Sequence, residues 1–600
     1  MSVDRRGFLQ YFAATGLSST LFPGALYAIH NNKQPATVRS AVNTPVVNPS
    51  AFNGSTHIGS EETGDWQPIT VEEIAQAEKI AGLSFTAEER TLMLEDLNDR
   101  LASFQSMRKE ALPNSVAPAI QFDLRAVGVY PPEGAVNRLT NWTPERVIRP
   151  DTDEELAFMS VAELASLIKS RQVTSLALTQ LYLRRLKQYD EVLEAVVTLT
   201  EERALAQAVA MDKELDAGAW RGPLHGIPWG AKDLLSVAGY PTTWGAMPFK
   251  DQQIEEDAAV VKRLDDAGAV LVAKLTLGAL AWGDVWYDGV TRNPWNIEQG
   301  SSGSSAGPGS AVAAGLVGFA IGSETLGSIV SPSTRNGITG LRPTFGRVSR
   351  HGAMALSWSM DKLGPMCRSA QDCALVFDAI HGEDRLDPTA VNAPFNWQSQ
   401  VDIASLRVGY IETAFEGTYN GKKADDATLA VLRDMGVKLQ SLTLPQRDVD
   451  PLLLTLNVEA GAAFDEITRN REIDSMVRQI RRAWPNSFRA SRFVPAVEYI
   501  QANRYRTLLM REMEEMMQGI DVFVAPSFRG GALQITNLTG HPAVVVPNRF
   551  DKLTDNPGSP RRSPGSITFT GRLYKDDAVL AVAHAYQQQT DFHLRRPPIA

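Results

Sequence analysis

Residues 300–310 read GSSGSSAGPGS, and residues 311–330 continue as AVAAGLVGFAIGSETLGSIV. Tracts of glycine and serine are usually flexible linkers. This tract instead leads directly into an alanine-rich stretch, a short apolar strand and a second small-residue turn, GSETLGS, at 322–328. Two such loops joined by a tightly packing helix indicate close approach of the backbone to a bound molecule. We therefore interpret residues 300–310 as part of a site.

The sequence around this stretch alternates between apolar strands and helices. The runs LHGIPWGAKD (224–233), GAVLVAKL (268–275) and DVFVAPS (521–527) are typical of buried strands. Stretches such as DAAVVKRLDDAG (257–268) have the pattern of amphipathic helices. This alternation predicts an α/β fold with a mixed or largely parallel sheet. We expect one large domain over residues 155–600.

The first residues are typical of an export signal. Arg5 and Arg6 precede Phe8 and Leu9, and an apolar run and small residues follow. The paired arginines resemble the twin-arginine signal. We assign residues 1–28 to a signal peptide, with the basic start of an amphipathic helix as the alternative. The assignment predicts passage through the twin-arginine export machinery to a bacterial periplasm or to the exterior.

Composition excludes several classes of protein. The net charge is −10 and the isoelectric point is near 5.5, which argues against a nucleic-acid partner. Cys367 and Cys373 are the only cysteines, so the chain has neither a disulfide framework nor a zinc site of four cysteines. We expect both to pack in or near the core, and we expect no metal and no organic cofactor.

A set of motifs resembles the amidase signature family in order and spacing. The motifs are GIPWGAKDLLSVAGYPTTWGA (226–246), TRNPWN (291–296), AVAAGL (311–316), GLRPT (340–344), DKLGPMCRS (361–369) and NLTGHPAVVVP (537–547). The resemblance implies the family's fold, a mixed central sheet covered by helices on both faces. It also implies a hydrolase of carbon–nitrogen bonds other than peptide bonds.

The resemblance implies a catalytic triad of Lys232, Ser304 and Ser328, with a cis peptide bond beside Ser304. A serine hydroxyl is a weak nucleophile that needs a base within hydrogen-bond distance. A lysine can be that base when burial lowers its pKa and leaves the amine neutral. Ser304 would pass its proton to Lys232 while taking one from Ser328, and it would later protonate the leaving amine.

The neighbours of these three residues have supporting roles in this interpretation. Gly303 and Gly307 let the loop fold tightly, and Ser305 supports Ser304 by hydrogen bonding. The oxyanion hole, which would stabilise the negative charge of the tetrahedral intermediate, is expected to consist of backbone N–H groups. They belong to Thr325, Leu326, Gly327 and Ser328.

Rival residues exist for each role. The run GSSAG at 303–307 also fits a nucleophile elbow with Ser305 as the nucleophile, although no apolar strand precedes it. Lys274 also ends an apolar strand and is a rival base, but we interpret it as a snorkelling lysine. Glu324 is expected to cap backbone N–H groups rather than to act as a base.

Three positions depart from the family's usual residues. Leu326 and Ala306 stand where the family usually has glycine, and Val330 stands where it usually has arginine. We expect Leu326 to restrict the backbone of the oxyanion turn, because only glycine takes a positive φ at low cost. Arg335 is the arginine that could replace the missing charge.

The N-terminal third has its own organisation. Residues 29–64 are predicted to be a polar tether, residues 65–118 a helical hairpin and residues 119–154 a connecting segment. The hairpin resembles the C subunit of the bacterial tRNA-dependent amidotransferase. A hairpin fused to the chain would pack along the catalytic domain as a strap.

The leading hypothesis is an exported amidase that cleaves a small-molecule carboxamide through an acyl-enzyme on Ser328. The alternatives are the glutamine-amidase subunit of a tRNA-dependent amidotransferase and a binding protein on the amidase scaffold. We expect residues 281–290 and 440–500 to determine the substrate. The sequence leaves the oligomeric state open, a homodimer included.

Overall fold

The computed structural model describes residues 67–107, 113–116, 120–133, 137–144, 146–553 and 558–599. The predicted signal peptide (1–28) and tether (29–64) lie outside the described residues. Both therefore remain predictions.

The centre of the protein is an eleven-stranded sheet. Its strands, from one edge to the other, are β14 (Gln440–Leu442), β13 (Val408–Ile411), β15 (Val522–Pro526), β17 (Arg562–Gly571), β16 (Ala543–Lys552), β10 (Thr339–Arg342), β11 (Lys362–Cys367), β9 (Phe319–Glu324), β3 (Pro228–Lys232), β4 (Val270–Leu275) and β2 (Val196–Leu199). The three runs expected to be buried strands form β3, β4 and β15.

The sheet is mixed, as the sequence predicts. The strands β9, β3 and β4 run parallel to one another, and so do β14, β13 and β15. The central strands between β15 and β9 pair antiparallel with their neighbours. The sheet thus has two parallel regions. The motifs of residues 226–328 lie in or next to the parallel region formed by β9, β3 and β4.

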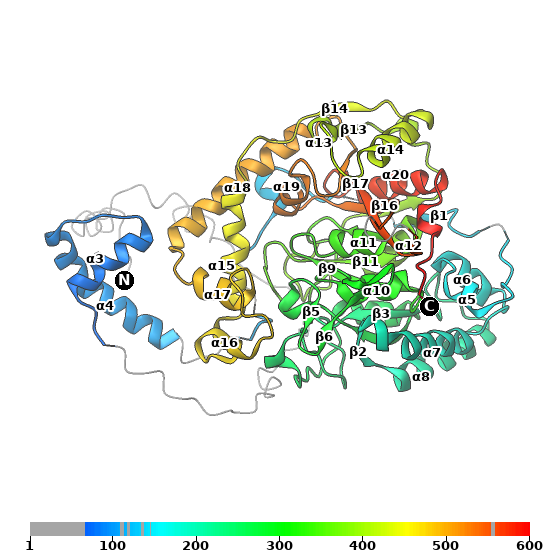
Figure 1. The fold of residues 1–600 in the computed structure, drawn as a ribbon, viewed down its shortest axis with the longest axis horizontal. Helices are drawn as coiled ribbons and strands as arrows, with labels where there is room; N and C mark the ends of the chain where they lie inside the picture. The colour runs from blue at the N-terminus through cyan, green and yellow to red at the C-terminus, as the bar shows by residue number, and fades with distance from the viewer. Residues whose placement is uncertain are drawn as a thin grey trace, which may run out of the picture. The chain divides into compact units, whose positions relative to one another are not determined.

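Helices cover both faces of the sheet, which confirms the predicted architecture (Figure 1). Successive side chains of a strand point to opposite faces. On β9, Ala320 packs into the apolar cluster that contains α10 (Ala306–Ala313), and Ile321 packs into the cluster that contains α12 (Ala370–Ile380) and α20 (Asp576–Gln588). The apolar residues of β9 therefore pack into two hydrophobic cores, one on each side of the sheet.

The remaining elements surround these layers. The helices are α5 (Asp153–Ala157), α6 (Val161–Lys169), α7 (Ser175–Leu193), α8 (Glu201–Asp216), α9 (Ala259–Asp266), α11 (Val330–Asn336), α13 (Glu412–Phe415), α14 (Lys422–Asp434), α15 (Leu454–Ala463), α16 (Asp465–Arg469), α17 (Trp484–Ser491), α18 (Ala496–Met516) and α19 (Ala532–Thr539). The short strand pairs are β1 (Arg138–Thr140) with β12 (Asn396–Gln398), β5 (Val285–Trp286) with β6 (Gly289–Val290), and β7 (Arg292–Asn293) with β8 (Asn296–Gly300).

The predicted hairpin consists of α3 (Val71–Ala81) and α4 (Ala87–Met107). Thr70 begins α3 with a capping box to Glu73. The Asn98 side chain of α4 accepts from the Ile69 N–H at 2.8 Å and donates to the Ile69 carbonyl at 3.4 Å, which ties the start of the hairpin to its second helix. The packing of this hairpin along the sheet domain stays a prediction.

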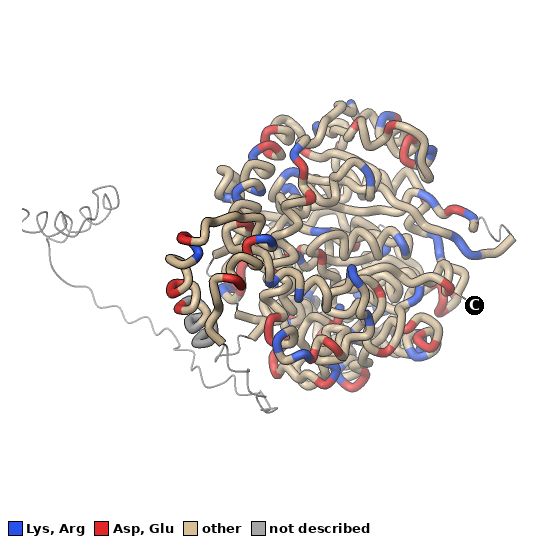
Figure 2. The backbone as a smooth tube through the Cα atoms, turned by 60° about the vertical axis from the view of Figure 1, so that its left-hand side comes forward, with Lys and Arg blue, Asp and Glu red and all other residues tan. Residues whose placement is uncertain are grey.

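None of the helices within the described ranges has both the length and the apolar character that crossing a membrane requires. Basic and acidic residues are interspersed over the backbone in the view of Figure 2 and do not separate by sign.

Candidate active site

The site lies where two neighbouring parallel strands end. β3 ends at Lys232, β9 ends at Glu324, and the register pairs Ala231 with Ile321. Loops beyond the carboxyl ends of parallel strands meet at one edge of the sheet. This register brings Lys232 beside Ser323, the penultimate residue of β9.

The Lys232 amine lies among three serine hydroxyls. Its Nζ is 2.8 Å from Ser304 Oγ, 2.8 Å from Ser323 Oγ and 3.1 Å from Ser305 Oγ. Lys232 is fully buried and forms no ion pair within the described part of the chain. Burial lowers the pKa of the Lys232 amine well below its usual range, and the nearby carboxylates oppose this shift only in part. A neutral amine offers a lone pair to which one of the hydroxyls can donate.

Ser304 stands at the entrance to α10, after a peptide bond with Gly303 that is cis. A Cβ atom on Gly303 would lie 1.7 Å from the carbonyl oxygen of Gly283. A Cβ atom on Gly307 would lie 2.5 Å from the backbone nitrogen of Thr276. Neither position accepts a side chain, so both glycines allow the loop to pack directly against neighbouring backbone.

The Ser305 hydroxyl is fixed to strand β9. It donates to the Ser323 carbonyl at 3.1 Å and accepts from the Ser323 N–H at 3.1 Å. Ser305 is fully buried, and among the described residues no histidine contacts its hydroxyl, as an elbow nucleophile would need. The geometry therefore fits the supporting role and not the rival role as nucleophile.

Ser328 lies in the turn that follows β9. The Ser305 N–H donates to the Ser328 carbonyl at 3.2 Å, which joins this turn to the serine pair. The Ser328 residue is half-buried, and its hydroxyl has no hydrogen-bond partner among the residues with described positions, Ser304 included. Catalytic hydrogen bonds often tighten only when substrate binds, and a serine hydroxyl reorients about a single bond. The structure thus joins Lys232 to Ser304 and leaves the Ser328 hydroxyl unengaged in the adjoining turn.

The backbone of this turn supplies free donors. The N–H groups of Thr325, Leu326, Gly327 and Ser328 donate no hydrogen bond to any atom of the described chain. Unused donors grouped in one turn can bind an oxyanion. Of these residues only Gly327 has a positive φ, of 84°, so leucine at position 326 is compatible with the conformation of the turn. The restriction expected from Leu326 is therefore absent.

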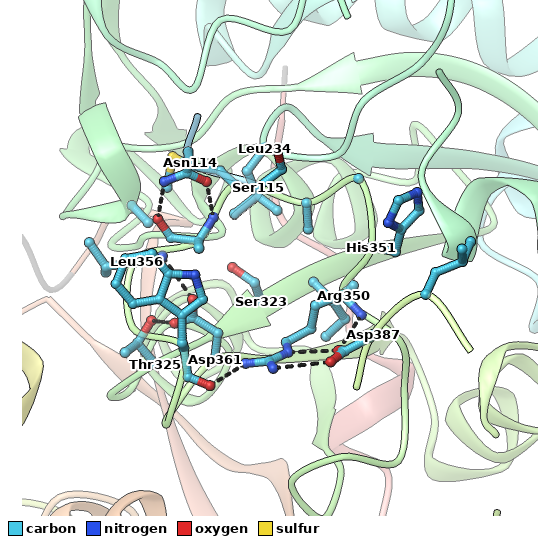
Figure 3. Close-up of a pocket in the computed structure, with 18 of the residues that line it drawn as sticks. Asn114, Ser115, Leu234, Ser323, Thr325, Arg350, His351, Leu356, Asp361 and Asp387 are labelled. Carbon is cyan, nitrogen blue, oxygen red and sulfur yellow. Dashed lines mark hydrogen bonds and ion pairs between the residues drawn. The ribbon is translucent and has the colours of Figure 1, made fainter. Parts of the chain in front are cut away.

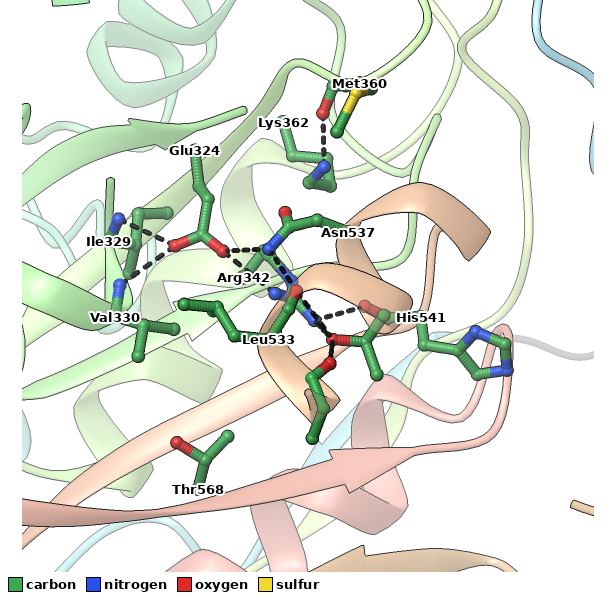
Figure 4. A network of polar contacts seen from close by, with 12 residues as sticks. Glu324, Ile329, Val330, Arg342, Met360, Lys362, Leu533, Asn537, His541 and Thr568 are labelled. Atoms are coloured by element: carbon green, nitrogen blue, oxygen red, sulfur yellow. Dashed lines mark hydrogen bonds and ion pairs between the residues drawn. The ribbon is translucent and has the colours of Figure 1, made fainter. Parts of the chain in front are cut away.

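A buried hydrogen-bond network fixes the backbone of Ile329 and Val330, which follow Ser328 (Figure 4). The Glu324 carboxylate accepts from the N–H groups of Ile329 at 2.8 Å and Val330 at 2.9 Å, which is the capping role predicted for it. Its other oxygen accepts from Arg342 and Asn537, each at 2.8 Å. Burial alone would raise the pKa of Glu324, but Arg342 and these hydrogen bonds hold it at about 2. The charged carboxylate anchors the turn that carries Ser328.

The arginine beside this turn is not the one that the sequence analysis named. Arg335 is exposed and has no hydrogen bond or ion pair within the described ranges, whereas Arg342 forms a fully buried ion pair with Glu324 at 2.8 Å. Arg335 faces solvent because α11 turns that position away from the sheet. Arg342 ends β10, and the sheet places it beneath the turn.

Lys274 is not a second base, and it does not snorkel. Its amine is 2.7 Å from the Asp233 carboxylate and also donates to the Pro241 carbonyl and the Thr242 hydroxyl, both at 2.6 Å. Both partners of the ion pair are fully buried. The expected snorkelling is wrong because a carboxylate follows Lys232 in the sequence and meets Lys274 across the strands.

A cavity of about 90 Å³ adjoins the serine cluster (Figure 3). Ser323 and Thr325 line it on the side of the turn, and Ala281 and Leu234 contribute apolar surface. Of the two segments expected to determine the substrate, only 281–290 contributes, through Ala281. The remaining lining comes from residues 350–363, residues 386–388 and the pair 114–115, which the sequence analysis did not single out.

Three further residues of the site were also missed. Ser323 contacts Lys232, Arg342 pairs with Glu324, and the Asp361 carboxylate accepts from the Thr325 hydroxyl at 2.6 Å. Arg342 and Asp361 lie in the motifs GLRPT and DKLGPMCRS, and Ser323 lies in the run GSETLGS. Each is a polar residue within or next to the end of a buried strand, which was an available signal. The described residues contain no cluster of three or more histidine, cysteine or acidic side chains that could hold a metal ion.

A buried lysine among serine hydroxyls, at the carboxyl end of a strand in a mixed sheet, is typical of serine hydrolases that use lysine as the base. The chain belongs to the amidase signature family, because the Amidase family model matches residues 177–579. It is a hydrolase that acts on the carbon–nitrogen bonds of amides.

Relatives and solved structures agree with this family. The chain is 32% identical over 481 residues to the A subunit of the glutamyl-tRNA(Gln) amidotransferase of Geobacillus kaustophilus, an alignment that covers 73% of this chain and 98% of that relative. The structure is similar to the native peptide amidase of Stenotrophomonas maltophilia, with 28% identity, a TM-score of 0.64 and coverage of 73% and 98%. It is also similar to an amidase family protein of Bacillus anthracis, with 25% identity, a TM-score of 0.66 and coverage of 74% and 93%.

Proposed function

We propose that this protein is an exported amidase that hydrolyses a small-molecule carboxamide through an acyl-enzyme on Ser328. The observation that carries the proposal is the Lys232 amine, which is buried without a counter-ion and lies 2.8 Å from the Ser304 hydroxyl. Burial lowers the pKa of this amine and favours its neutral form, which can accept a proton.

The proposed reaction begins with two coupled proton transfers. Lys232 takes the Ser304 proton as Ser304 takes the Ser328 proton, and the Ser328 oxygen attacks the amide carbon. The N–H groups of residues 325–328 stabilise the resulting oxyanion. Ser304 then protonates the leaving nitrogen and takes a proton back from Lys232, the carbon–nitrogen bond breaks, and ammonia or an amine departs. Water attacks the acyl-enzyme through the same relay and releases the carboxylic acid.

The proposal includes where the protein acts and what it binds. Residues 1–28 support export through the twin-arginine machinery and a periplasmic or secreted location. The net charge of −10 and the mixed distribution of charges support a small-molecule substrate rather than a nucleic acid. Fractionation of cells that express the full chain tests the location, and retention of the uncleaved protein in the cytoplasm contradicts it.

A second candidate function is the glutamine-amidase subunit of a tRNA-dependent amidotransferase. The observation in its favour is the similarity to the A subunits of several glutamyl-tRNA(Gln) amidotransferases, among them that of Methylococcus capsulatus, with 32% identity over 482 residues. Release of ammonia from glutamine, measured with the purified chain and then with tRNA and the other subunits present, separates the two functions. Stimulation by those partners supports the second candidate.

The test of the nucleophile is Ser328→Ala in the full chain. We expect loss of amide hydrolysis by at least about 10⁴-fold and loss of labelling by a fluorophosphonate. Ser331→Ala is the matched control, because Ser331 lies three positions later, in α11, and its hydroxyl pairs with Ser302 at 2.7 Å. Full activity of the Ser328→Ala protein contradicts the proposal, as does a fluorophosphonate adduct on another serine.

A further inference from the structure

The chain returns from its N-terminal hairpin to the site through residues 113–116. Asn114 and Ser115 line the cavity that Ser323 and Thr325 line from the other side. Figure 3 shows the Asn114 side chain directed at the backbone of the opposing loop. A segment that precedes the family match at residue 177 therefore contributes to the wall of the candidate site.

Asn114 is fixed by two hydrogen bonds across a long sequence separation. Its Nδ2 donates to the Ala355 carbonyl at 2.8 Å, and its Oδ1 accepts from the Ala355 N–H at 2.6 Å. This pair of bonds satisfies both backbone groups of Ala355 and holds one loop against the other as a strand would. The opposing loop continues through Leu356 to Asp361, whose carboxylate binds the Thr325 hydroxyl. The clamp at Asn114 is thus connected to the oxyanion turn through one loop.

The cavity is suited to an uncharged group. The charged side chains in its lining already have partners: Arg350 is 2.9 Å from Asp387, and Asp361 accepts from Thr325 and from the backbone N–H of Leu356 at 2.8 Å. Much of the remaining surface is apolar, from Leu234, Ala281, Leu356 and Leu363 among others. A cavity of about 90 Å³ is large enough for several waters or for a short alkyl group.

We propose that residues 113–116 form a fixed wall of the substrate pocket and that the Asn114 clamp limits the substrate to amides with a short, uncharged group beside the scissile bond. The proposal rests on the proposed function, because it concerns the pocket of that same site. The clamp fixes the loop of residues 355–361, and the loop sets the depth of the cavity. Without the clamp the loop moves outward and longer groups fit.

The test compares Asn114→Ala with Asn98→Ala in the full chain. Asn98 makes the same two-bond clamp to the backbone of Ile69 but lies in the hairpin and does not line the cavity. Two series of substrates are compared. Straight-chain primary amides from acetamide to octanamide vary the acyl side of the scissile bond, and acetamides with N-alkyl groups of increasing length vary the amine side. Each series gives kcat and KM as a function of length. Labelling rates of Ser328 with a short and a long alkyl fluorophosphonate give a second readout that needs no turnover.

We expect wild-type protein and Asn98→Ala to prefer the short members of one of the two series, either the primary amides or the N-alkyl acetamides. Asn114→Ala should lower that preference over the longest members at least about fivefold, mainly through KM. The same change should appear in the ratio of the two labelling rates. An unchanged length preference in Asn114→Ala overturns the inference, and so does an equal loss of activity toward all members.

The outcomes separate this inference from the proposed function. If wild-type protein hydrolyses none of these amides but Ser328 is labelled, the ratio of labelling rates decides on the clamp. If folded wild-type protein is not labelled at Ser328, the proposed function fails and the inference fails with it.

Discussion

Lys232 and Lys274 are both buried lysines at the ends of adjacent parallel strands, yet their surroundings differ in kind. The register pairs Ala231 with Lys274 and Lys232 with Leu275, so the two lysines point to opposite faces of the sheet. Lys274 faces the Asp233 carboxylate at 2.7 Å, and Lys232 faces three hydroxyls and no carboxylate within ion-pair distance in the described chain.

The comparison shows that burial alone does not make a base. A carboxylate partner favours the charged form of a buried lysine and opposes the lowering of its pKa by burial, and removing one member of such a pair leaves the other as an unpaired buried charge. A buried lysine with hydroxyl partners is stabilised in its neutral form and can accept a proton. The two residues therefore should respond differently to the same substitution, one in activity and the other in stability.

The largest expected effect is on activity, in Lys232→Met. Methionine fills the space of the buried stem but cannot accept the Ser304 proton, so kcat for amide hydrolysis should fall about 10³–10⁴-fold. The free energy of unfolding should stay the same or rise, because the substitution removes a buried amine that has no counter-ion. Steady-state kinetics and urea denaturation of the full chain measure both. A variant that retains more than a tenth of the activity would show that Lys232 is not the base.

The next effect is on stability, in Lys274→Met. This substitution leaves the Asp233 carboxylate buried without its partner, and we expect the free energy of unfolding to fall by about 3–5 kcal/mol. The folded fraction should keep a kcat within about tenfold of wild type, because Lys274 contacts none of the catalytic hydroxyls.

The control for this second substitution is the double variant Lys274→Met with Asp233→Asn. Removing the unpaired charge should recover part of the lost stability, as read from the midpoint of urea denaturation. If Lys274→Met lowers activity as strongly as Lys232→Met while leaving stability unchanged, the distinction between the two lysines is wrong.

The sequence predicted the strands that carry the two lysines but not the carboxylate partner that distinguishes Lys274 from Lys232. The strand runs and the mixed sheet followed from apolar patterns, whereas the helices on both faces and the contact of Lys232 with Ser304 were implied by the resemblance to the amidase signature family. The partner of Lys274 did not, because Asp233 lies 41 positions earlier and meets it only through the register of β3 and β4. Pairing across strands is a property of the folded sheet, and periodicity along one strand does not contain it.

The same reason explains the missed residues of the oxyanion turn. Arg342 and Asn537 reach Glu324 from β10 and α19, which are distant in sequence. Arg335 lies close to Val330 in the sequence, but closeness in sequence does not indicate which arginine reaches the turn in the folded sheet. Asn114 was missed for a related reason, because a short polar segment between predicted elements shows no pattern that indicates its contact with Ala355.

The smallest expected effect, and the one that separates the two amines most finely, is the dependence of rate on pH. Lys232 must be neutral to act, so kcat/KM should rise about tenfold per pH unit below the pKa of its amine and level off above it. Burial lowers this pKa well below the ordinary 10.5, so the midpoint should lie well below that of an exposed lysine. The pKa of Lys274 is also lowered by burial, with Asp233 opposing the shift, but its titration does not reach the serines. Lys274→Met should therefore leave the midpoint in place.

The pH dependence of the free energy of unfolding is an independent test of the state of the Lys232 amine. Because the pKa of Lys232 is lower in the folded protein than in the unfolded chain, the unfolded chain binds more protons between the two values, and the free energy of unfolding rises with pH across that window. The destabilisation by Lys232 is complete below the folded pKa and disappears as pH rises toward 10.5. The stability advantage of Lys232→Met over wild type should accordingly shrink as pH increases, as measured by urea denaturation at a series of pH values. An advantage that grows with pH, or a kinetic midpoint near 10.5, would mean that the amine is charged in the folded protein and cannot draw the proton from Ser304.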